Sequence, residues 1–192
     1  MISSTNIKLK AQEFLRPVAE GLGSIGITPN AITVLGFLLS LSAGVAIGIG
    51  EVLTGALLFG LSGLCDTLDG IVARVNGKKS SFGAFLDSFL DRYSDFFPLA
   101  GLCHFAFLTD DSPLLVASLL TIAGSYATSY ARARAEALGV ECKVGLFERP
   151  ERFFVLFGGL LTGLIFPAVA ALAVLTNFTA FQRLICAARE LS

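Results

Sequence analysis

Long apolar stretches alternate with short polar ones along the chain, and this pattern predicts helices that cross a membrane. Residues 31–50 carry no charge, and twenty such residues suffice for a helix to span a hydrocarbon core of about 30 Å. Further apolar stretches cover residues 52–65, 98–108 and 114–131. Residues 153–182 also carry no charge, but a single helix of that length would extend about 45 Å. We therefore expect two helices there, joined by a tight turn near Pro167.

The first 27 residues have a different pattern. Apolar side chains recur every three or four positions, with lysine, arginine and glutamate between them. This periodicity predicts an amphipathic helix that lies on the membrane surface over residues 1–27. Thr28-Pro29-Asn30 then ends that helix and begins the next, because proline is suited to a first helical turn.

Composition supports a membrane protein. Of the 192 residues, 54% are hydrophobic and 15% are charged, whereas soluble domains carry roughly 25% charged residues. The mean hydropathy is +0.76. We predict one all-α polytopic membrane domain over residues 1–192, with the interfacial helix at 1–27 and a bundle of six transmembrane helices at 28–192. The net charge of −1 gives no reason to expect nucleic acid as a partner.

The basic residues give the predicted topology a direction. Thirteen of the fourteen lysines and arginines fall near the two termini, in the turn at residues 74–79 or between residues 132 and 152, and the remaining one is Arg92. The loops on the other side contain Glu51, Asp110 and Asp111 and no base. The positive-inside rule therefore places both termini on the cytoplasmic side of the cell membrane and requires an even number of spans. Six spans agree best with the apolar pattern.

Small residues and cysteines add two expectations. Gly44 with Gly48, and Gly159 with Gly163, are pairs that let helices approach closely, either within the bundle or between two copies of the chain. The cysteines are scattered and lack the paired spacing of a metal site, so we expect them to be reduced thiols. They are Cys65, Cys103, Cys142 and Cys186.

Four carboxylates stand out in this apolar background. Asp66 and Asp69 are three residues apart, and Asp87 and Asp91 are four apart, so each pair would share one face of a helix. We expect an antiparallel pair of helices to bring both faces together at one membrane boundary. The carboxylates would repel one another unless cations lay among them, and an all-oxygen ligand set suits Mg²⁺, Mn²⁺ or Ca²⁺. Four carboxylates can hold two such ions.

Two other interpretations of the acids remain open. They could form a buried ionic lock with Arg74, Arg92 and nearby lysines, although two arginines do not neutralise five acids once Asp95 is included. They could also belong to a cation pathway, but the far halves of the helices offer no polar relay. Gly70 and Gly83 instead allow a bulky ligand to approach the backbone, and Arg74 can bind a phosphate. These parts suit phosphoryl transfer on a diphosphate.

The acids belong to a longer motif that resembles the signature of the CDP-alcohol phosphotransferases. All eight fixed positions are present in Asp66-x2-Asp69-Gly70-x2-Ala73-Arg74-x8-Gly83-x3-Asp87-x3-Asp91. The resemblance implies a six-helix membrane enzyme, typically a homodimer, that displaces CMP from a CDP-linked lipid. It implies that the four aspartates bind two Mg²⁺ or Mn²⁺ ions and that Asp91 is also the general base. Residues implied to bind the CDP part of the donor are Pro29, Asn30, Gly70, Arg74 and Ser80.

A second segment bears on the acceptor. Residues 129–136 and 145–152 resemble the phosphatidylinositol-phosphate and archaetidylinositol-phosphate synthases. Their basic side chains would form a cationic pocket on the cytoplasmic side for a dianionic acceptor such as inositol 1-phosphate. Loops on that side are basic in any case. The predicted acceptor residues are Arg132, Arg134, Lys143, Arg149 and Arg152.

The sequence thus predicts a metal-dependent transferase that moves a phosphatidyl-type group from a CDP-lipid to inositol 1-phosphate. Glycerol 3-phosphate is the alternative acceptor, and serine fits less well because it needs fewer bases. A divalent-cation carrier and a non-catalytic membrane scaffold are the alternatives from other classes. The apolar helix faces accept diacyl or ether-linked isoprenoid chains alike.

Overall fold

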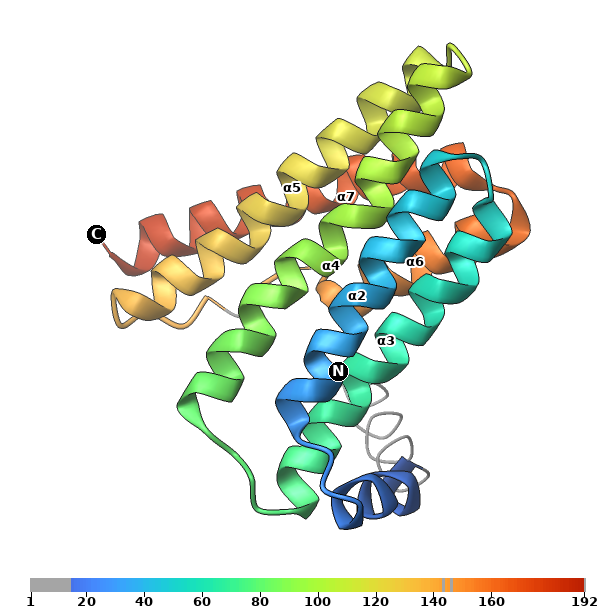
Figure 1. Ribbon diagram of the computed structural model, residues 1–192. Helices are drawn as coiled ribbons and strands as arrows, with labels where there is room; N and C mark the ends of the chain where they lie inside the picture. The colour runs from blue at the N-terminus through green and yellow to red at the C-terminus, as the bar shows by residue number, and fades with distance from the viewer. Residues whose placement is uncertain (1–14, 143, 146, 192) are drawn as a thin grey trace.

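The computed structural model describes residues 15–191, apart from residues 143 and 146. Residues 15–24 are helical, and the six helices after them account for most of the remaining chain (Figure 1). These helices are α2 (Pro29–Gly48), α3 (Val52–Val75), α4 (Ser81–Leu108), α5 (Ser112–Ala137), α6 (Arg149–Thr162) and α7 (Ile165–Glu190). The all-α prediction is confirmed.

Short polar side chains cap the amino termini of α2 and α4. The Thr28 hydroxyl accepts a hydrogen bond from the Ala31 amide at 3.3 Å, with Pro29 in the first turn of α2. The Ser80 hydroxyl does the same for the Gly83 amide at 3.0 Å, at the start of α4. The amino terminus of a helix leaves amide groups without partners, and such caps satisfy one of them. The polar turns of the sequence therefore fix where the helices begin.

The turn between α6 and α7 lies earlier than predicted. Gly163 ends α6 in the left-handed conformation, with φ of 75°, and α7 begins at Ile165. Pro167 is therefore in the first turn of α7, where the missing amide hydrogen has no helical partner to lose. The turn, expected near Pro167, lies three to four residues before it, and the expected division into two helices is confirmed.

The helices form two groups. In the first, α2 packs along both α3 and α4, while α3 and α4 touch each other little. In the second, α5 packs along α7, and α6 returns beside α7 (Figure 1). The groups meet where α4 contacts α5 and where α3 contacts α6. The expected direct packing of α3 on α4 is thus replaced by α2 as their shared partner.

Side-chain hydroxyls bind backbone carbonyls of neighbouring helices within each group. Ser40 of α2 donates to the Ser94 carbonyl at 2.7 Å, and Ser62 of α3 donates to the Gly36 carbonyl at 2.7 Å. In the second group Thr128 donates to the Thr176 carbonyl at 3.0 Å. Small polar residues of this kind let helices associate closely in an apolar environment.

Glycines make the closest helix crossing possible. A β-carbon on Gly101 of α4 would overlap the Gly44 carbonyl of α2, and one on Gly44 would overlap the Phe97 carbonyl. Gly44 and Gly48 therefore serve packing within the bundle, one of the two roles predicted for them. Gly159 packs against Ala168 of α7, but nothing lies near Gly163, which forms the turn instead.

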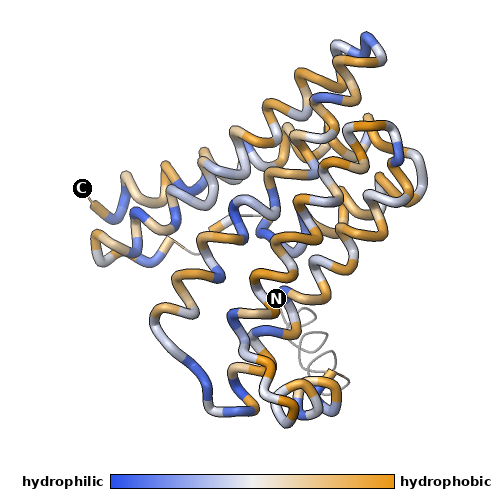
Figure 2. Tube along the Cα trace, viewed as in Figure 1, coloured by the Kyte–Doolittle hydropathy of each residue, from blue (hydrophilic) through white to orange (hydrophobic). Residues whose placement is uncertain are grey.

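Within the described part of the chain, four helices are long and apolar enough to cross a membrane: α2, α3, α5 and α7. Figure 2 shows apolar residues along the length of the helices and polar ones concentrated at the turns. The amino-terminal half of α4 carries the charges of the acidic segment, and α6 has 14 residues, or about 21 Å of helix. The presence of six spans therefore stays a prediction.

The helical residues 15–24 lie across the ends of α2 and α3 (Figure 1). Ala19 is fully buried and packs in one apolar cluster with Ile32 and Leu68. Val18 of this segment and Ile25, which follows it, remain exposed. Residues 1–14 of the predicted interfacial helix lie outside the described residues, and the position of the helix at a membrane surface stays a prediction.

Two of the cysteines are bonded, which corrects the expectation of reduced thiols. Cys142 follows α5, Cys186 lies in the last turns of α7, and they form a disulfide across 44 positions of sequence. Cys65 and Cys103 are free, as expected. The disulfide fastens the segment between α5 and α6 to α7. Its two cysteines come together only through the packing of α5 on α7, which their spacing does not reveal.

Candidate active site

The predicted metal ligands converge from the two sides of α2. Asp66 lies in the last turns of α3, and Asp87 and Asp91 lie in the first turns of α4. Each of these three offers a carboxylate oxygen, and the oxygens lie within 4.8 Å of one another. Because α3 and α4 diverge around α2, the carboxylates face each other across a space between the helices.

Asp69, the fourth predicted ligand, lies deeper. It is 5% exposed, and the Thr33 hydroxyl of α2 donates to its Oδ2 at 2.7 Å. The carboxylate is close enough to Asp66 and Asp87 to interact with them electrostatically. Helical spacing therefore brings all four acids to one region, with Asp69 held by a side chain that the sequence pattern did not single out.

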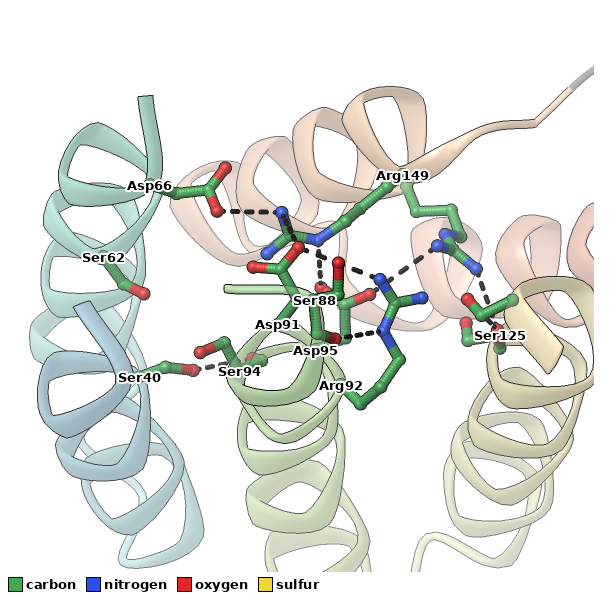
Figure 3. A network of polar contacts seen from close by, with 12 residues as sticks. Ser40, Ser62, Asp66, Ser88, Asp91, Arg92, Ser94, Asp95, Ser125 and Arg149 are labelled. Carbon is green, nitrogen blue, oxygen red and sulfur yellow. Dashed lines mark hydrogen bonds and ion pairs between the residues drawn. The ribbon is translucent and has the colours of Figure 1, made fainter. Parts of the chain in front are cut away.

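Arg149 is the main cation among the acids (Figure 3). Its Nη1 lies 2.9 Å from Asp66 Oδ1 and 2.8 Å from Asp91 Oδ2, and its Nε lies 3.2 Å from Asp95 Oδ1. From the sequence, Arg149 was expected in the acceptor pocket, and Arg74 and Arg92 were the possible partners of the acids. Arg92 does approach Asp91, at 3.8 Å.

Asp95 links this cluster to a second arginine, Arg152, which is buried. Its Oδ2 lies 3.6 Å from Nη2 of Arg152, whose Nη1 donates to the Ser125 carbonyl of α5 at 3.1 Å. Arg152 is 7% exposed, and its Nε has no partner among the described residues. Two of the predicted acceptor residues, Arg149 and Arg152, therefore share one carboxylate that lies outside the signature.

A cavity of about 1060 Å³ opens between α3, α4 and α6. All four signature aspartates line it, together with Gly70, Arg74 and Arg149. Its other wall is apolar and comes from leucines of α3 and phenylalanines of α6: Leu57, Leu61, Leu64, Phe153, Phe154 and Phe157. The cavity thus has one highly charged end and one apolar side.

Two glycines of α3 allow α6 to come close. A β-carbon on Gly63 would overlap the Phe153 ring, and one on Gly60 would lie 2.7 Å from the Phe157 ring. Because α6 begins at Arg149, this packing of its aromatic residues on α3 brings the arginine next to Asp66. The site therefore depends on a contact between the two helix groups.

The residues predicted to bind CDP fall into two places. Pro29, Asn30 and Ser80 lie where α2 and α4 begin, and a β-carbon on Gly83 would be 2.9 Å from Ser80 Oγ and 3.2 Å from Asn30 Oδ1. Gly70 and Arg74 lie on α3 along the cavity. The Arg74 guanidinium folds back toward Gly70, since a β-carbon there would be 3.4 Å from its Nη1.

The remaining acceptor residues do not reach the acids. Arg132 forms an ion pair of 2.9 Å with Glu136 on the surface of α5, and Arg134 is exposed. Lys143 lies outside the described residues. The structure instead adds Arg183 of α7, which is buried and donates to the carbonyls of Thr128 and Val144. The available signal was that Arg183 ends the uncharged stretch of residues 153–182.

The donor set fits a divalent cation. The ligand atoms are carboxylate oxygens, which hard ions such as Mg²⁺ and Mn²⁺ prefer. Within the described part of the chain, Asp87 Oδ1 is buried and has no hydrogen-bond donor. Buried carboxylate oxygens require a partner, and a metal ion bound between Asp66, Asp87 and Asp91 would supply one.

Comparison with known proteins identifies the family of the chain. The profile of the CDP-alcohol phosphatidyltransferase family matches residues 26–188. The chain belongs to this family. The archaetidylinositol phosphate synthase of Methanothermobacter thermautotrophicus is 40% identical over 180 residues, which cover 91% of this chain and 88% of that protein. The resemblance inferred from the aspartate motif is confirmed, and the chain is a transferase of phospholipid synthesis.

Solved structures of another CDP-alcohol phosphatidyltransferase have the same fold. The phosphatidylinositol phosphate synthase of Mycobacterium tuberculosis with CDP-DAG bound is 34% identical, with a TM-score of 0.85. That match covers 91% of this chain and 94% of the other. The same enzyme in complex with manganese and citrate gives a TM-score of 0.84 at 34% identity, covering 89% of this chain and 87% of that one.

Proposed function

We propose that this CDP-alcohol phosphatidyltransferase transfers a phosphatidyl-type group from a CDP-lipid to inositol 1-phosphate and releases CMP. The observation that carries the proposal is the convergence of four signature aspartates and Arg149 at the charged end of an apolar-walled cavity, with the buried Arg152 behind them on Asp95. Support for the donor comes from the relative with CDP-DAG bound, and support for the acceptor from relatives that are inositol phosphate synthases.

The cavity suits a ligand with a diphosphate and lipid tails. Arg74 would bind a phosphate of the donor, and Gly70 would allow the diphosphate to approach the backbone of α3. Pro29, Asn30 and Ser80 would contact the CDP part from the ends of α2 and α4. The tails would then lie along the leucines and phenylalanines between α3 and α6, because these side chains offer an apolar surface continuous with the charged end.

Asp66, Asp69, Asp87 and Asp91 would hold one or two Mg²⁺ or Mn²⁺ ions. Bound there, the metal would neutralise the diphosphate oxygens and the charge that develops on the leaving CMP. The relative in complex with manganese supports a divalent ion. The chain itself supplies the fixed orientation of the carboxylates, notably through the Thr33 hydroxyl on Asp69.

Asp91 would act as the general base. The acceptor hydroxyl oxygen forms a bond to the lipid-side phosphorus, in line with the bond from that phosphorus to the bridging oxygen. The bond from the lipid-side phosphorus to the oxygen that joins the two phosphorus atoms breaks, and CMP leaves with that oxygen. Asp91 accepts the proton of the hydroxyl. Asp91 suits this role because it lies between the other carboxylates and Arg149, where the acceptor is expected.

The acceptor phosphate would bind on the side of α5, α6 and α7. Arg149 and Arg152 of α6 are the cations beside the acids, and the buried Arg183 of α7 adds another. Arg132 and Arg134 of α5 belong to the same proposal, as does Lys143, which lies outside the described residues. Arginine binds a phosphate dianion through paired N–H groups, which favours a phosphorylated acceptor over serine. Glycerol 3-phosphate carries the same phosphate chemistry and is the second candidate.

The decisive experiment measures CMP release by the purified protein with CDP-lipid and Mg²⁺. Inositol 1-phosphate, glycerol 3-phosphate and serine are supplied separately. We expect turnover with inositol 1-phosphate, none without an acceptor, and loss of turnover in Asp91→Asn. Asp110→Asn, which changes an acid in the loop after α4, is the matched control and should retain activity.

Normal turnover in Asp91→Asn would refute the proposed base. Turnover with glycerol 3-phosphate alone would refute the acceptor assignment while leaving the chemistry intact. Uptake of Mn²⁺ into liposomes that contain the protein but no CDP-lipid, without any CMP release, would favour the cation carrier instead.

We further propose that the acids and both termini face the cytoplasm, as the distribution of basic residues requires. The six-span topology, the interfacial helix and the homodimer belong to the same proposal. Labelling of single cysteines from each side of a vesicle tests the orientation, and the mass of the detergent-solubilised complex tests the dimer.

A further inference from the structure

Arg149 contacts two proposed metal ligands through one nitrogen and a third carboxylate, which is not a proposed ligand, through another. Its Nη1 bridges Asp66 and Asp91, which are two of the proposed metal ligands. Its Nε contacts Asp95, which lies one helical turn beyond Asp91 on the same face of α4. Nη1 is at the tip of the guanidinium group, whereas Nε joins that group to the side chain. The Nε contact with Asp95 can therefore be kept while the Nη1 contacts with Asp66 and Asp91 are lost.

We propose that Arg149 is an internal counter-cation that competes with divalent metal for Asp66 and Asp91 and is retained by Asp95 when metal binds. The inference rests on the proposed function, because it concerns the same metal site and the same acceptor. The displaced Nη1 would then become available for the acceptor phosphate. Asp95 is in this sense a positioning residue, since it acts on substrate only through Arg149.

The competition follows from the distances. Nη1 lies within 2.9 Å of one oxygen of Asp66 and one oxygen of Asp91. A metal ion bound to the same oxygens would lie about 2.0–2.6 Å from each, which places it too close to the nitrogen for both cations to remain. Two positive charges at such a separation also repel strongly where solvent is limited. Metal binding through these two oxygens therefore requires Nη1 to leave.

Asp95 can hold the arginine because it is itself held. Its other oxygen faces Arg152, which is buried and donates to the Ser125 carbonyl of α5. The contact to Arg149 is made through Nε, close to the pivot of the guanidinium group. Rotation about the last side-chain bonds can therefore swing Nη1 away from Asp66 while the Nε contact persists.

One consequence is a coupling between the two ligands. An arginine whose donors face three carboxylates has few left for a phosphate, so the acceptor would bind weakly before the metal. After metal binds, the same donors are released beside the acids where the acceptor hydroxyl must react. Metal would thus strengthen the binding of the acceptor phosphate, and by linkage the phosphate would strengthen the binding of metal.

The first test measures Mn²⁺ affinity by electron paramagnetic resonance, with neither CDP-lipid nor acceptor present. Arg149→Gln should bind Mn²⁺ more tightly, by on the order of tenfold or more, because the competitor is gone. Asp95→Asn should bind it more weakly, because Arg149 then has only Asp66 and Asp91 as partners. Arg189→Gln, an exposed arginine near the end of α7, is the control and should match the wild type.

A double variant separates tethering from simple charge. If Asp95 acts through Arg149, Asp95→Asn should have little effect on Mn²⁺ affinity when Arg149→Gln is already present. An effect of equal size in both backgrounds would mean that Asp95 is only a distant negative charge, and would overturn its positioning role. Melting in saturating Mn²⁺ verifies that every variant is folded.

The second test follows the coupling by calorimetric titration with inositol 1-phosphate in the presence and absence of Mn²⁺. The wild type should bind it more tightly with Mn²⁺, and Arg149→Gln should lose most of that enhancement. Wild-type or weaker Mn²⁺ affinity in Arg149→Gln would overturn the competition outright. Because no CDP-lipid is present, these results stand apart from CMP release. Absence of turnover with the expected Mn²⁺ changes would refute the proposed function alone.

Discussion

The hydrogen bond from Thr33 to Asp69 gives the sharpest test of how the acidic site is held. The Thr33 hydroxyl has one hydrogen, and it lies 2.7 Å from Asp69 Oδ2 but 3.1 Å from the Pro29 carbonyl. The shorter contact goes to the charged group and is the stronger of the two. In Thr33→Val the shape of the side chain is nearly kept while this donor is removed. Asp69 is 5% exposed, so water has little access to replace it.

The size of the effect follows from the charge on the acceptor. Hydrogen bonds to charged groups contribute about 1.5–3 kcal/mol. Loss of a partner that orients a metal ligand lowers metal affinity by about 10–100-fold. A tenfold change in affinity corresponds to about 1.4 kcal/mol, so the two ranges agree. We therefore expect Thr33→Val to weaken Mn²⁺ binding by one to two orders of magnitude.

Electron paramagnetic resonance titration of Mn²⁺ in detergent measures this affinity directly. Thr33→Ser keeps the hydroxyl and should remain near the wild type. Thr162→Val removes a hydroxyl that binds only the Gly158 carbonyl of its own helix, at 2.7 Å, and is the matched control. If Thr33→Val lowers the melting temperature but leaves Mn²⁺ affinity unchanged, Asp69 is not a metal ligand and the reasoning fails.

Three further outcomes are expected. Gly101→Ala should lower the free energy of unfolding by about 1–3 kcal/mol, because the new methyl group meets backbone of α2. Gly158→Ala has no atom near its β-carbon and lies inside α6, so it should melt at or slightly above the wild-type temperature. Cys142→Ser should also lower the melting temperature, because a cross-link over 44 positions contributes about 4 kcal/mol in the chain-entropy treatment. Cys103→Ser breaks no disulfide and should lower the melting temperature much less. EDTA should abolish CMP release and added Mn²⁺ or Mg²⁺ should restore it, whereas activity that persists in EDTA would refute a metal-dependent reaction.

The convergence of the aspartates could be predicted because helical geometry determines it. Residues three or four apart share a face, and the polar turn at residues 76–80 reverses the chain between α3 and α4. The sequence does not reveal that α2 lies between those helices. The glycines and serines that let α2 contact both of them are individually unremarkable residues, and only the fold pairs Ser40 with Ser94 and Gly44 with Gly101.

The position of Arg149 could not be predicted for a related reason. It lies 83 residues after Asp66, and the two meet because Gly60 and Gly63 admit the rings of α6. Nothing in the local pattern around either residue specifies that contact. The same holds for the disulfide, which depends on the packing of α5 on α7. The turn at Gly163 was missed because proline was taken as the break, although proline is well tolerated in a first helical turn.

The division of the helices into two groups has a consequence for how this enzyme class can diversify. The whole aspartate signature lies on α3 and α4 of the first group, whereas Arg149, Arg152 and Arg183 lie on α6 and α7 of the second. In the proposed function the first group carries out the bond exchange, and the second selects the alcohol. Substitutions confined to the second group could therefore change the product lipid while the chemistry is inherited intact. A chimera that keeps residues 1–111 and takes α5 to α7 from a relative with another acceptor would be expected to acquire that relative's specificity.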